Sequence, residues 1–408
     1  MAPVSYRRGV IEVVGIGASG WDSIGQPERH LVEVAELVLG GQRLLDLLPP
    51  FAGQTRAFWP SDLREALPQL VAGHENQCVV VVASGDPLCY GVGSTLIEMF
   101  GVESVRIHPA VSSVSLAAAR MGWAVGSYDA VRIRTREADE LRRYLAPGRR
   151  LVILSRDRST PGIVDNLLGE SGFGHSAVTV LAHLGSPNEA RWDGSWPADL
   201  PGLHILCVTC RPERQSSAWS TAPGLSDDAF DHDGQLTKRD VRGSALAHLM
   251  PVPGQLLWDV GAGAGSIGIE WARTDPSCRT VAIERDLARA KRIELNAARL
   301  GVPDLQVVKG EAPDVLPGLP TPDAVFLGGG ASAEVIELCW AALAPGGRLV
   351  AHAVTLQTET VLVGAWRRLG GQLTRISIES IRPIGSYDGW QPARPVVQWA
   401  GQRPLSEQ

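Results

Sequence analysis

The residues best suited to chemistry in the second half of this 408-residue chain lie in a loop with glycine at every second position. Gly261, Gly263 and Gly265 follow an apolar run that contains Asp259, and a helical pattern begins just beyond them. Glycines in such a loop let the backbone approach a ligand and let the helix pack closely on the strand. The spacing predicts a ligand site at the end of the first strand of an α/β domain.

Two later segments indicate the kind of ligand. Glu284 ends a second apolar run at the distance where an acidic side chain can hold ribose hydroxyls. Glu311 and Ala312 follow a third run, at the edge where an adenine would lie. A dinucleotide-dependent dehydrogenase also carries a glycine-rich loop, but its catalytic His, Tyr or Lys set is not found downstream.

Together these segments resemble the seven-stranded, Rossmann-like class I methyltransferase fold, whose cofactor is S-adenosylmethionine. The resemblance implies that the glycine-rich loop holds the amino-acid part of the cofactor, that Glu284 binds its ribose, and that Glu311 and Ala312 flank its adenine. The residues implied for the loop are Asp259, Gly261, Ala262, Gly263 and Gly265.

The acceptor of the methyl group is indicated by the segment that ends in Gly328–Gly330. It has no Asn or Asp followed by Pro-Pro and an aromatic, the motif that holds an exocyclic amine of a nucleic acid. It also has no cysteine nucleophile for pyrimidine methylation. Three glycines instead leave room for a bulky, flat acceptor.

An upstream segment narrows the family. Thr237–Arg242 reads Thr-Lys-Arg-Asp-Val-Arg, and with the loops above it resembles the decarboxylating precorrin C15-methyltransferases over nearly all of residues 235 to 400. We hypothesise that Arg242 anchors peripheral carboxylates of a tetrapyrrole and that Asp240 or Lys238 assists proton delivery. Asp240 stands where glutamate is expected, and the alternative is that all three residues form a solvated first helical turn.

The first half carries a different set of loops. Gly17 follows the first strand, Ser84, Gly85 and Asp86 follow the strand expected over residues 78–83, and Ser112 and Ser113 precede a helix. Their order resembles the tetrapyrrole methylase superfamily (class III), especially its cobalamin-pathway C5 branch, over about residues 9 to 210. The resemblance implies that all six residues line a second S-adenosylmethionine cleft between two α/β lobes. Diphthine synthase belongs to the same superfamily, but the fused C15-type half disfavours it.

The elements that must position these loops alternate between strands and helices, which is typical of α/β domains. Strands are expected over residues 10–14, 78–83, 104–107, 151–154, 177–182, 204–208, 255–260, 280–284, 306–309, 324–327 and 348–352, with 373–381 and 396–399 as an antiparallel pair. Helices are expected over residues 27–38, 61–72, 91–99, 113–121, 161–168, 238–249, 266–273, 287–300, 333–342 and 357–369. Residues 212–233 have the composition of a linker between domains 1–211 and 234–408.

The bulk composition excludes several classes of protein. A formal net charge of −6 disfavours a nucleic-acid binder. Cys207 and Cys210 lie in a strand-like run, where side chains three apart face opposite ways, so no metal site is expected. No apolar stretch is long enough to span a bilayer, and we expect a cytoplasmic protein.

Together the two resemblances imply a bifunctional enzyme of corrin synthesis with one S-adenosylmethionine site per domain. It would methylate C5 and C15 of a reduced precorrin and decarboxylate the C12 acetate. One alternative has a single catalytic domain with the other as a docking module. Another is an RNA methyltransferase with an accessory domain, and members of both families self-associate, so a homo-oligomer is expected.

Overall fold

The computed structural model describes residues 9–59, 63–72, 77–135, 138–213 and 219–405. The chain divides into two compact units. The first contains residues 1–136 and 147–216, and the second contains residues 137–146 and 217–408. The domain boundaries expected from the sequence remain a prediction.

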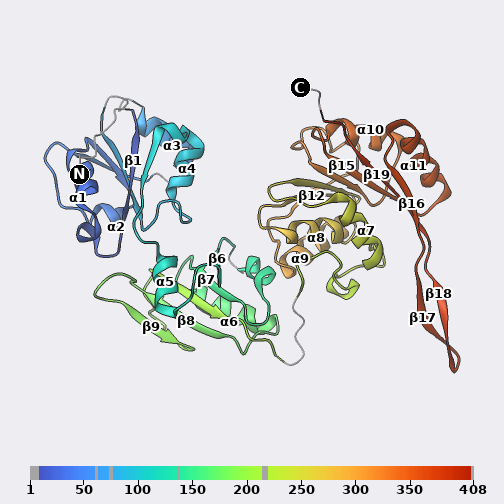
Figure 1. The fold of residues 1–408 in the computed structure, drawn as a ribbon, viewed down its shortest axis with the longest axis horizontal. Coiled ribbons are helices and arrows are strands. Elements are labelled where there is room, and N and C mark those ends of the chain that lie inside the picture. Colours follow the sequence, from blue (N-terminus) through green and yellow to red (C-terminus); the bar gives the residue numbers. More distant parts are fainter. Residues whose placement is uncertain (1–8, 60–62, 73–76, 136–137, 214–218, 406–408) are drawn as a thin grey trace. The chain divides into compact units, whose positions relative to one another are not determined.

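The first lobe of the first unit is a parallel sheet with helices around it (Figure 1). Its strand order is β3 (Thr55–Phe58), β2 (Leu37–Gly40), β4 (Val79–Ser84), β1 (Ile11–Ile16) and β5 (Val105–His108). Its helices are α1 (Gln26–Val34), α2 (Gln42–Leu45), α3 (Leu63–Val71) and α4 (Val92–Phe100). Because helices cover both faces, central strands such as β1 are buried at every residue and read as continuous apolar runs.

The second lobe is a mixed sheet with mostly antiparallel pairing. Its order is β6 (Asp129–Arg132), β7 (Arg150–Leu154), β10 (His204–Thr209), β8 (Ala177–Ala182) and β9 (Ala190–Asp193). Only the β6–β7 pair is parallel. Helices α5 (Ser113–Met121) and α6 (Thr160–Glu170) belong to this lobe, and the two lobes confirm the predicted two-lobed α/β unit.

The second unit is built on a seven-stranded sheet. The strand order is β13 (Gln306–Lys309), β12 (Arg279–Glu284), β11 (Leu256–Val260), β14 (Ala324–Leu327), β15 (Arg348–Ala353), β19 (Val396–Gln402) and β16 (Gln372–Ile376). β19 runs antiparallel to both of its neighbours, β15 and β16, and the other strand pairs of this sheet are parallel. The helices are α7 (Arg239–Leu249), α8 (Ser266–Thr274), α9 (Leu287–Arg299), α10 (Ala333–Ala342) and α11 (Leu356–Leu369). This confirms the Rossmann-like fold predicted for the second half.

Two predicted elements are wrong in part. The helix expected over 27–38 ends at Val34, because Leu37–Gly40 is a buried strand between β3 and β4 of a parallel sheet. The strand expected over 373–381 ends at Ile376, and Glu379–Ile384 (β17) pairs with Tyr387–Pro392 (β18) as a separate ribbon. The first two residues of the helix expected over 61–72 lie outside the described residues.

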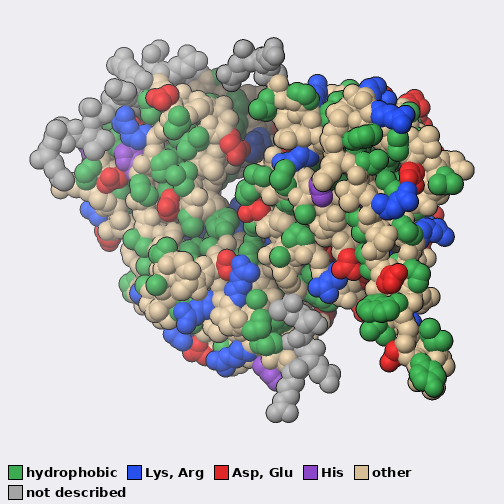
Figure 2. All heavy atoms as spheres, turned by 45° about the vertical axis from the view of Figure 1, so that its right-hand side comes forward, with side chains coloured by type: hydrophobic (Ala, Val, Ile, Leu, Met, Phe, Trp, Pro, Cys, Tyr) green, Lys and Arg blue, Asp and Glu red, His purple; other side chains and the backbone are tan. Residues whose placement is uncertain are grey.

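The β17–β18 ribbon extends away from the sheet of the second unit (Figure 1). Its apolar side chains Ile384, Tyr387 and Trp390 are each more than half exposed. Figure 2 shows hydrophobic side chains on the surface of the projecting ribbon. All six residues of β17 and five of the six residues of β18 are exposed. The root of the ribbon, however, contributes residues to the cavity described below.

Segments from outside the predicted second domain also pack in the second unit. In the expected linker, Leu225, Ala229 and Phe230 are buried in its core. Its residues 214–218 lie outside the described residues. A 3-10 turn at Asp139–Tyr144 joins the unit through Arg143, whose guanidinium donates to the carbonyls of Ala272 and Arg273 at 3.0 Å each. No helix of the described chain is long and apolar enough to cross a membrane.

Candidate active sites

A cavity of about 910 Å³ opens at the carboxyl ends of the strands of the second unit. Its walls come from the loops after β11, β12, β14 and β15, from the start of α7, and from the root of the β17–β18 ribbon. This is the edge at which open α/β sheets bind ligands, and the volume lies within the usual range for ligand pockets.

The glycine-rich loop forms one wall in a backbone conformation that suits glycine. Gly261 and Gly263 have φ of +68° and +61°. A Cβ at Gly261 would lie 2.7 Å from the carbonyl oxygen of Gly329, so the loop after β11 can touch the triple-glycine loop after β14 only because Gly261 has no side chain. The result is a cradle of backbone atoms from Gly261, Ala262 and Gly263 along the cavity.

Glu284 ties two of these loops together. Its Oε2 accepts from the Gly263 amide at 2.8 Å and its Oε1 accepts from the Asp286 amide at 3.0 Å. The side chain is 5% exposed and lines the cavity. A carboxylate has about four acceptor positions, so lone pairs remain for the hydroxyls of a ligand. Glu311 and Ala312 line the cavity beside it, and Glu311 forms an exposed ion pair with Arg285.

Asp259 and Gly265 lie behind the cavity wall and do not line it. The Asp259 carboxylate accepts from the Gly268 amide at 2.9 Å, in the first turn of α8, and its Oδ1 is buried without a partner. Burial raises the pKa of this carboxyl to about 7. Gly265 has φ of +77°, and a Cβ there would meet Ile293. Both residues shape the loop from behind.

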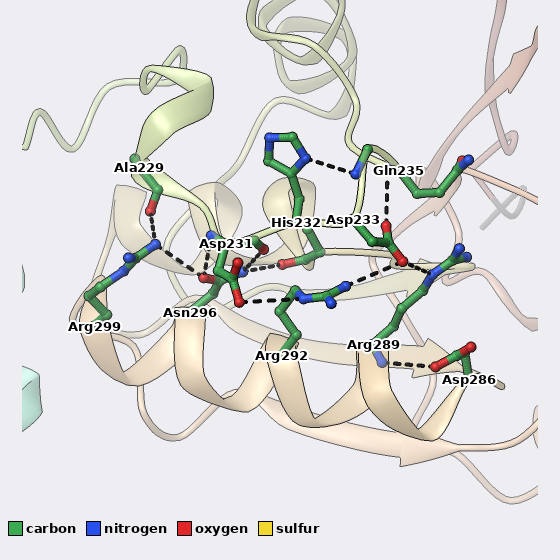
Figure 3. A network of polar contacts seen from close by, with 12 residues as sticks. Ala229, Asp231, His232, Asp233, Gln235, Asp286, Arg289, Arg292, Asn296 and Arg299 are labelled. Atoms are coloured by element: carbon green, nitrogen blue, oxygen red, sulfur yellow. Dashed lines mark hydrogen bonds and ion pairs between the residues drawn. The ribbon is translucent and has the colours of Figure 1, made fainter.

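Polar contacts from side chains of α9 hold another wall of the cavity in place (Figure 3). Arg289 donates to Asp233 at 2.8 Å, and the Asn296 amide donates to the carbonyls of Asp231 and Ala264 at 2.9 and 3.0 Å. These bonds hold residues 231–233 against the helix. They thereby place Gln235, which lines the cavity, over the glycine-rich loop.

The three candidate catalytic residues separate in the structure. Lys238 and Asp240 line the cavity, and the Lys238 ammonium lies 3.5 Å from Asp227. Arg242 does not line the cavity and has no exposed surface. Its guanidinium donates to Glu270 at 2.6 Å, to Asp227 at 3.2 Å and to backbone carbonyls. Arg242 is therefore placed to stabilise the fold and not to bind the substrate.

Other cavity residues were not singled out from the sequence. Arg239, Arg382 and Arg394 are exposed on the cavity walls, and their side chains have no hydrogen bond or ion pair within the described chain. His352 lines the cavity at the end of β15, next to Phe326. The sequence has no fixed spacing by which these arginines could be recognised, because Arg382 lies in the ribbon and Arg394 lies just after it. His352 does end an expected strand, which was the available signal.

A second cavity, of about 440 Å³, lies within the first unit. Gly17, Ser84, Gly85 and Ser113 line it, so three loops that are far apart in the sequence meet at this cavity. The close approach of the loops that contain Gly85 and Ala110 depends on Gly15, because a Cβ at this position would overlap the Gly85 carbonyl and the Ala110 amide. The geometry brings four of the six predicted residues to one cavity.

The other two predicted residues hold the loops in shape. The Asp86 carboxylate accepts from the Leu88 amide at 2.9 Å within its own turn. The Ser112 hydroxyl accepts from the Ser115 amide at 3.0 Å and so caps α5. Neither lines the cavity.

The second lobe adds polar groups that the sequence reasoning missed. His204 and Ser155 line the cavity from neighbouring strands, and the His204 Nε2 and Ser155 Oγ atoms are buried without partners. Burial lowers the pKa of His204. Arg43 also lines the cavity and donates to Ser84 at 3.3 Å. Each of these residues comes from a different segment of the chain, so no local sequence motif identifies them together.

The comparisons with known proteins agree with this division. The family model for the precorrin methyltransferase domain matches residues 228–403, and that for tetrapyrrole (corrin/porphyrin) methylases matches residues 10–197. A precorrin-6Y C(5,15)-methyltransferase (decarboxylating) from Sinorhizobium sp is 42% identical over 96% of this chain and 95% of its own. Two shorter relatives each match one part of the chain. A cobalt-precorrin-7 C(5)-methyltransferase of Salmonella typhimurium is 30% identical over 44% of this chain and 88% of its own. A cobalt-precorrin-6B C(15)-methyltransferase (decarboxylating) of Salmonella typhi is 34% identical over 41% of this chain and 89% of its own.

Proposed function

The chain belongs to the precorrin-6Y C5,15-methyltransferase (decarboxylating) family, and from that premise we propose that its two cavities are two separate methyl-transfer sites. The second unit would methylate C15 and decarboxylate the C12 acetate, and the first would methylate C5. The observation that carries the proposal is that each unit has its own cavity lined by its own glycine-containing loops.

The cavity of the second unit fits S-adenosylmethionine, which when bound supplies a methyl group on a cationic sulfur. Gly261, Ala262 and Gly263 present backbone to the amino-acid part. The Glu284 carboxylate, held by two amides, is oriented for the ribose hydroxyls. Glu311 and Ala312 lie where the adenine would be. In the first unit, Gly17, Ser84, Gly85 and Ser113 would hold the second cofactor.

The residues near the methyl acceptor act mainly by position. The bridge carbons of a reduced tetrapyrrole are enamine-like nucleophiles, so alignment with the methyl group supplies most of the acceleration. Methylation of C15 leaves an iminium that accepts the electrons of the C12 acetate as carbon dioxide leaves. A proton must then reach the remaining carbon. Asp240 and Lys238 line the cavity and are the candidates for holding and delivering that proton.

The relatives suggest an order for the two reactions. One is named for C15 methylation of cobalt-precorrin-6B and another for C5 methylation of cobalt-precorrin-7. We propose the same sequence here, with C15 methylation and decarboxylation first and C5 methylation second. A cytoplasmic location and self-association also remain proposals, and sedimentation of the purified chain would test the latter.

The peripheral carboxylates of the substrate need cationic partners, and three arginines on the cavity walls provide them. Arg239, Arg382 and Arg394 line the cavity, and their side chains have no hydrogen bond or ion pair within the described residues. The arginine fork matches a carboxylate in two parallel hydrogen bonds. They therefore take the role that the sequence had suggested for Arg242.

Substitutions of these arginines should separate binding from folding. Arg382→Ala and Arg394→Ala should each raise the KM for the tetrapyrrole several-fold and leave stability and cofactor affinity unchanged. Arg242→Ala should instead destabilise the second unit by ~3–5 kcal/mol, because Glu270 would be left buried without its partner. Urea unfolding and steady-state kinetics measure the two effects. A raised KM in a stable Arg242→Ala protein would return Arg242 to the anchoring role.

The function is tested by anaerobic incubation with S-adenosylmethionine and reduced precorrin-6, the products being weighed by mass spectrometry. The whole chain should add two methyl groups and release carbon dioxide. Calorimetry should find two cofactor sites per chain. A single site would favour one catalytic unit with a docking module. Salt-sensitive RNA binding without tetrapyrrole methylation would favour the RNA methyltransferase alternative.

A further inference from the structure

His183 is a histidine of the first unit whose ring has no partner and whose surface borders the smaller cavity. It follows directly after β8 and lines the cavity of about 440 Å³. Among residues 180–184 it alone is not buried. No hydrogen bond or ion pair from the described residues reaches its imidazole. The ring is therefore available to a ligand in this cavity.

The backbone of His183 is held in an uncommon conformation. Its φ is +52°, in the left-handed region that residues other than glycine adopt only where their surroundings fix them. Its amide donates to the Leu203 carbonyl at 3.2 Å, and its carbonyl accepts from the Ser186 amide at 3.1 Å. Backbone strain of this kind is concentrated at functional sites. The two hydrogen bonds keep the residue at one position on the cavity wall.

The loop that begins at His183 is joined to a loop proposed to hold the cofactor. The Ser19 hydroxyl donates to the Gly185 carbonyl at 2.8 Å. Gly17, two residues before Ser19, lines the same cavity as His183. A hydrogen bond between the lobes of the first unit thus keeps His183 close to the loop proposed for S-adenosylmethionine.

His204, the other histidine among the residues that line this cavity, is placed differently. Its Nδ1 lies 2.8 Å from the Pro201 carbonyl oxygen, so this nitrogen carries the proton and donates it. Its Nε2 is buried. Neither nitrogen of His204 is open to a ligand, and His183 is the lining histidine that a substrate can reach.

Methylation of C5 requires the release of a proton, whereas the decarboxylating reaction at C15 does not. In both reactions the electron pair of an enamine carbon forms the bond to the methyl group, while the carbon–sulfur bond breaks and its pair stays on sulfur. The macrocycle thereby gains one positive charge. In the second unit the departing carbon dioxide leaves its bonding electrons in the macrocycle and cancels this charge. At C5 no group departs, so a proton must leave to restore a neutral macrocycle.

We infer that His183 is the base that takes this proton from C5 after methyl transfer in the first unit. An imidazole nitrogen bonds to the proton, and the electrons of the C5–H bond form the double bond of the neutral product. The imidazolium then gives the proton to water. Histidine suits this role because imidazole accepts and releases protons readily near neutral pH. The inference rests on the proposed function of the first unit and makes His183 a catalytic residue.

Replacing His183 by asparagine tests the role with little disturbance of the fold. Asparagine tolerates a positive φ but cannot take up the proton. The variant should lower kcat for C5 methylation by about a hundredfold with little change in KM, and calorimetry should still find two cofactor sites. From reduced precorrin-6 it should accumulate a product with one added methyl and no C12 carboxyl. His175→Asn is the control, since His175 is exposed and lines neither cavity.

Rescue by a base in solution separates this role from a structural one. His183→Gly also accommodates the positive φ, and it leaves space where the ring had been. Imidazole added to this variant should restore part of the C5 methylation rate, and it should not accelerate the wild-type chain. A residue that only shapes the loop would give a variant that imidazole does not rescue.

Chemical labelling gives a readout that does not depend on activity. Diethyl pyrocarbonate acylates accessible, unprotonated imidazole nitrogens, and peptide mass spectrometry should find it on His183 and His175 of the free wild-type chain but not on His204. S-adenosylhomocysteine together with the singly methylated product of the His183→Asn chain should protect His183 and leave His175 reactive. A wild-type C5 rate in His183→Asn, no rescue by imidazole, or an unprotected His183 overturns the inference. If the wild-type chain adds no methyl group at C5, the proposed function of the first unit itself fails, and the role of His183 falls with it.

Discussion

Replacing Gly261 by alanine should abolish C15 methylation and carbon dioxide release while leaving the first unit able to bind its cofactor. The new Cβ would lie 2.7 Å from the Gly329 carbonyl oxygen, which is backbone and cannot rotate away. The residue would also have to adopt φ of +68°, which costs a non-glycine residue about 1–2 kcal/mol. The loops after β11 and β14 must then separate, and the cradle for the amino-acid part of S-adenosylmethionine is lost.

Calorimetry should find one cofactor site per chain in Gly261→Ala in place of two, and mass spectrometry should find precorrin-6 without C15 methylation. Gly254→Ala is the matched control, because Gly254 has φ of +84° but open space around its Cβ position. This control carries the backbone strain without the collision and should keep both sites. Two cofactor sites in Gly261→Ala would show that the second unit binds S-adenosylmethionine elsewhere.

Most of the fold could be predicted because its signal is local. A run such as residues 324–327 is apolar, short and bounded by turn residues, and it is the strand β14 in the structure with the same limits. The errors occur where a helix and a strand are both compatible with the same apolar pattern. Leu37–Gly40 continues the apolar spacing of α1, so the periodicity did not show that the helix ends at Val34. Burial between parallel strands decided the matter, and that is a tertiary effect.

The candidate sites divide in the same way. Backbone-built features could be predicted, because glycine at positions such as 85 and 261 is needed where two loops touch. Side chains that act across the sheet could not. Arg242 carried a family-like motif, but nothing local shows that Glu270, 28 residues away, neutralises it. His352 is hydrogen-bonded to Gln398 in a strand that arrives 46 residues later, so this contact arises only in the folded sheet.

Replacing Gly15 by alanine should silence the first unit and leave the second intact. Gly15 lies in β1, where its missing side chain lets the Gly85 carbonyl and the Ala110 amide meet. A Cβ would overlap both, and the two loops that carry Ser84 and Ser113 into the cavity would be pushed apart. With the proposed order of reactions, the variant should convert reduced precorrin-6 to a product with one added methyl and no C12 carboxyl, and then stop.

The control for this variant is Gly162→Ala, because Gly162 lies inside α6 with open space around its Cβ position. That change should stabilise the helix by ~1 kcal/mol and leave both methylations intact. Calorimetry should again find one cofactor site in Gly15→Ala, now the one that Gly261→Ala lacks. A Gly15→Ala chain that still adds both methyl groups would place C5 methylation outside the first unit. Loss of both methylations in a folded chain would mean that the two units depend on each other, and the two-site proposal would have to be replaced.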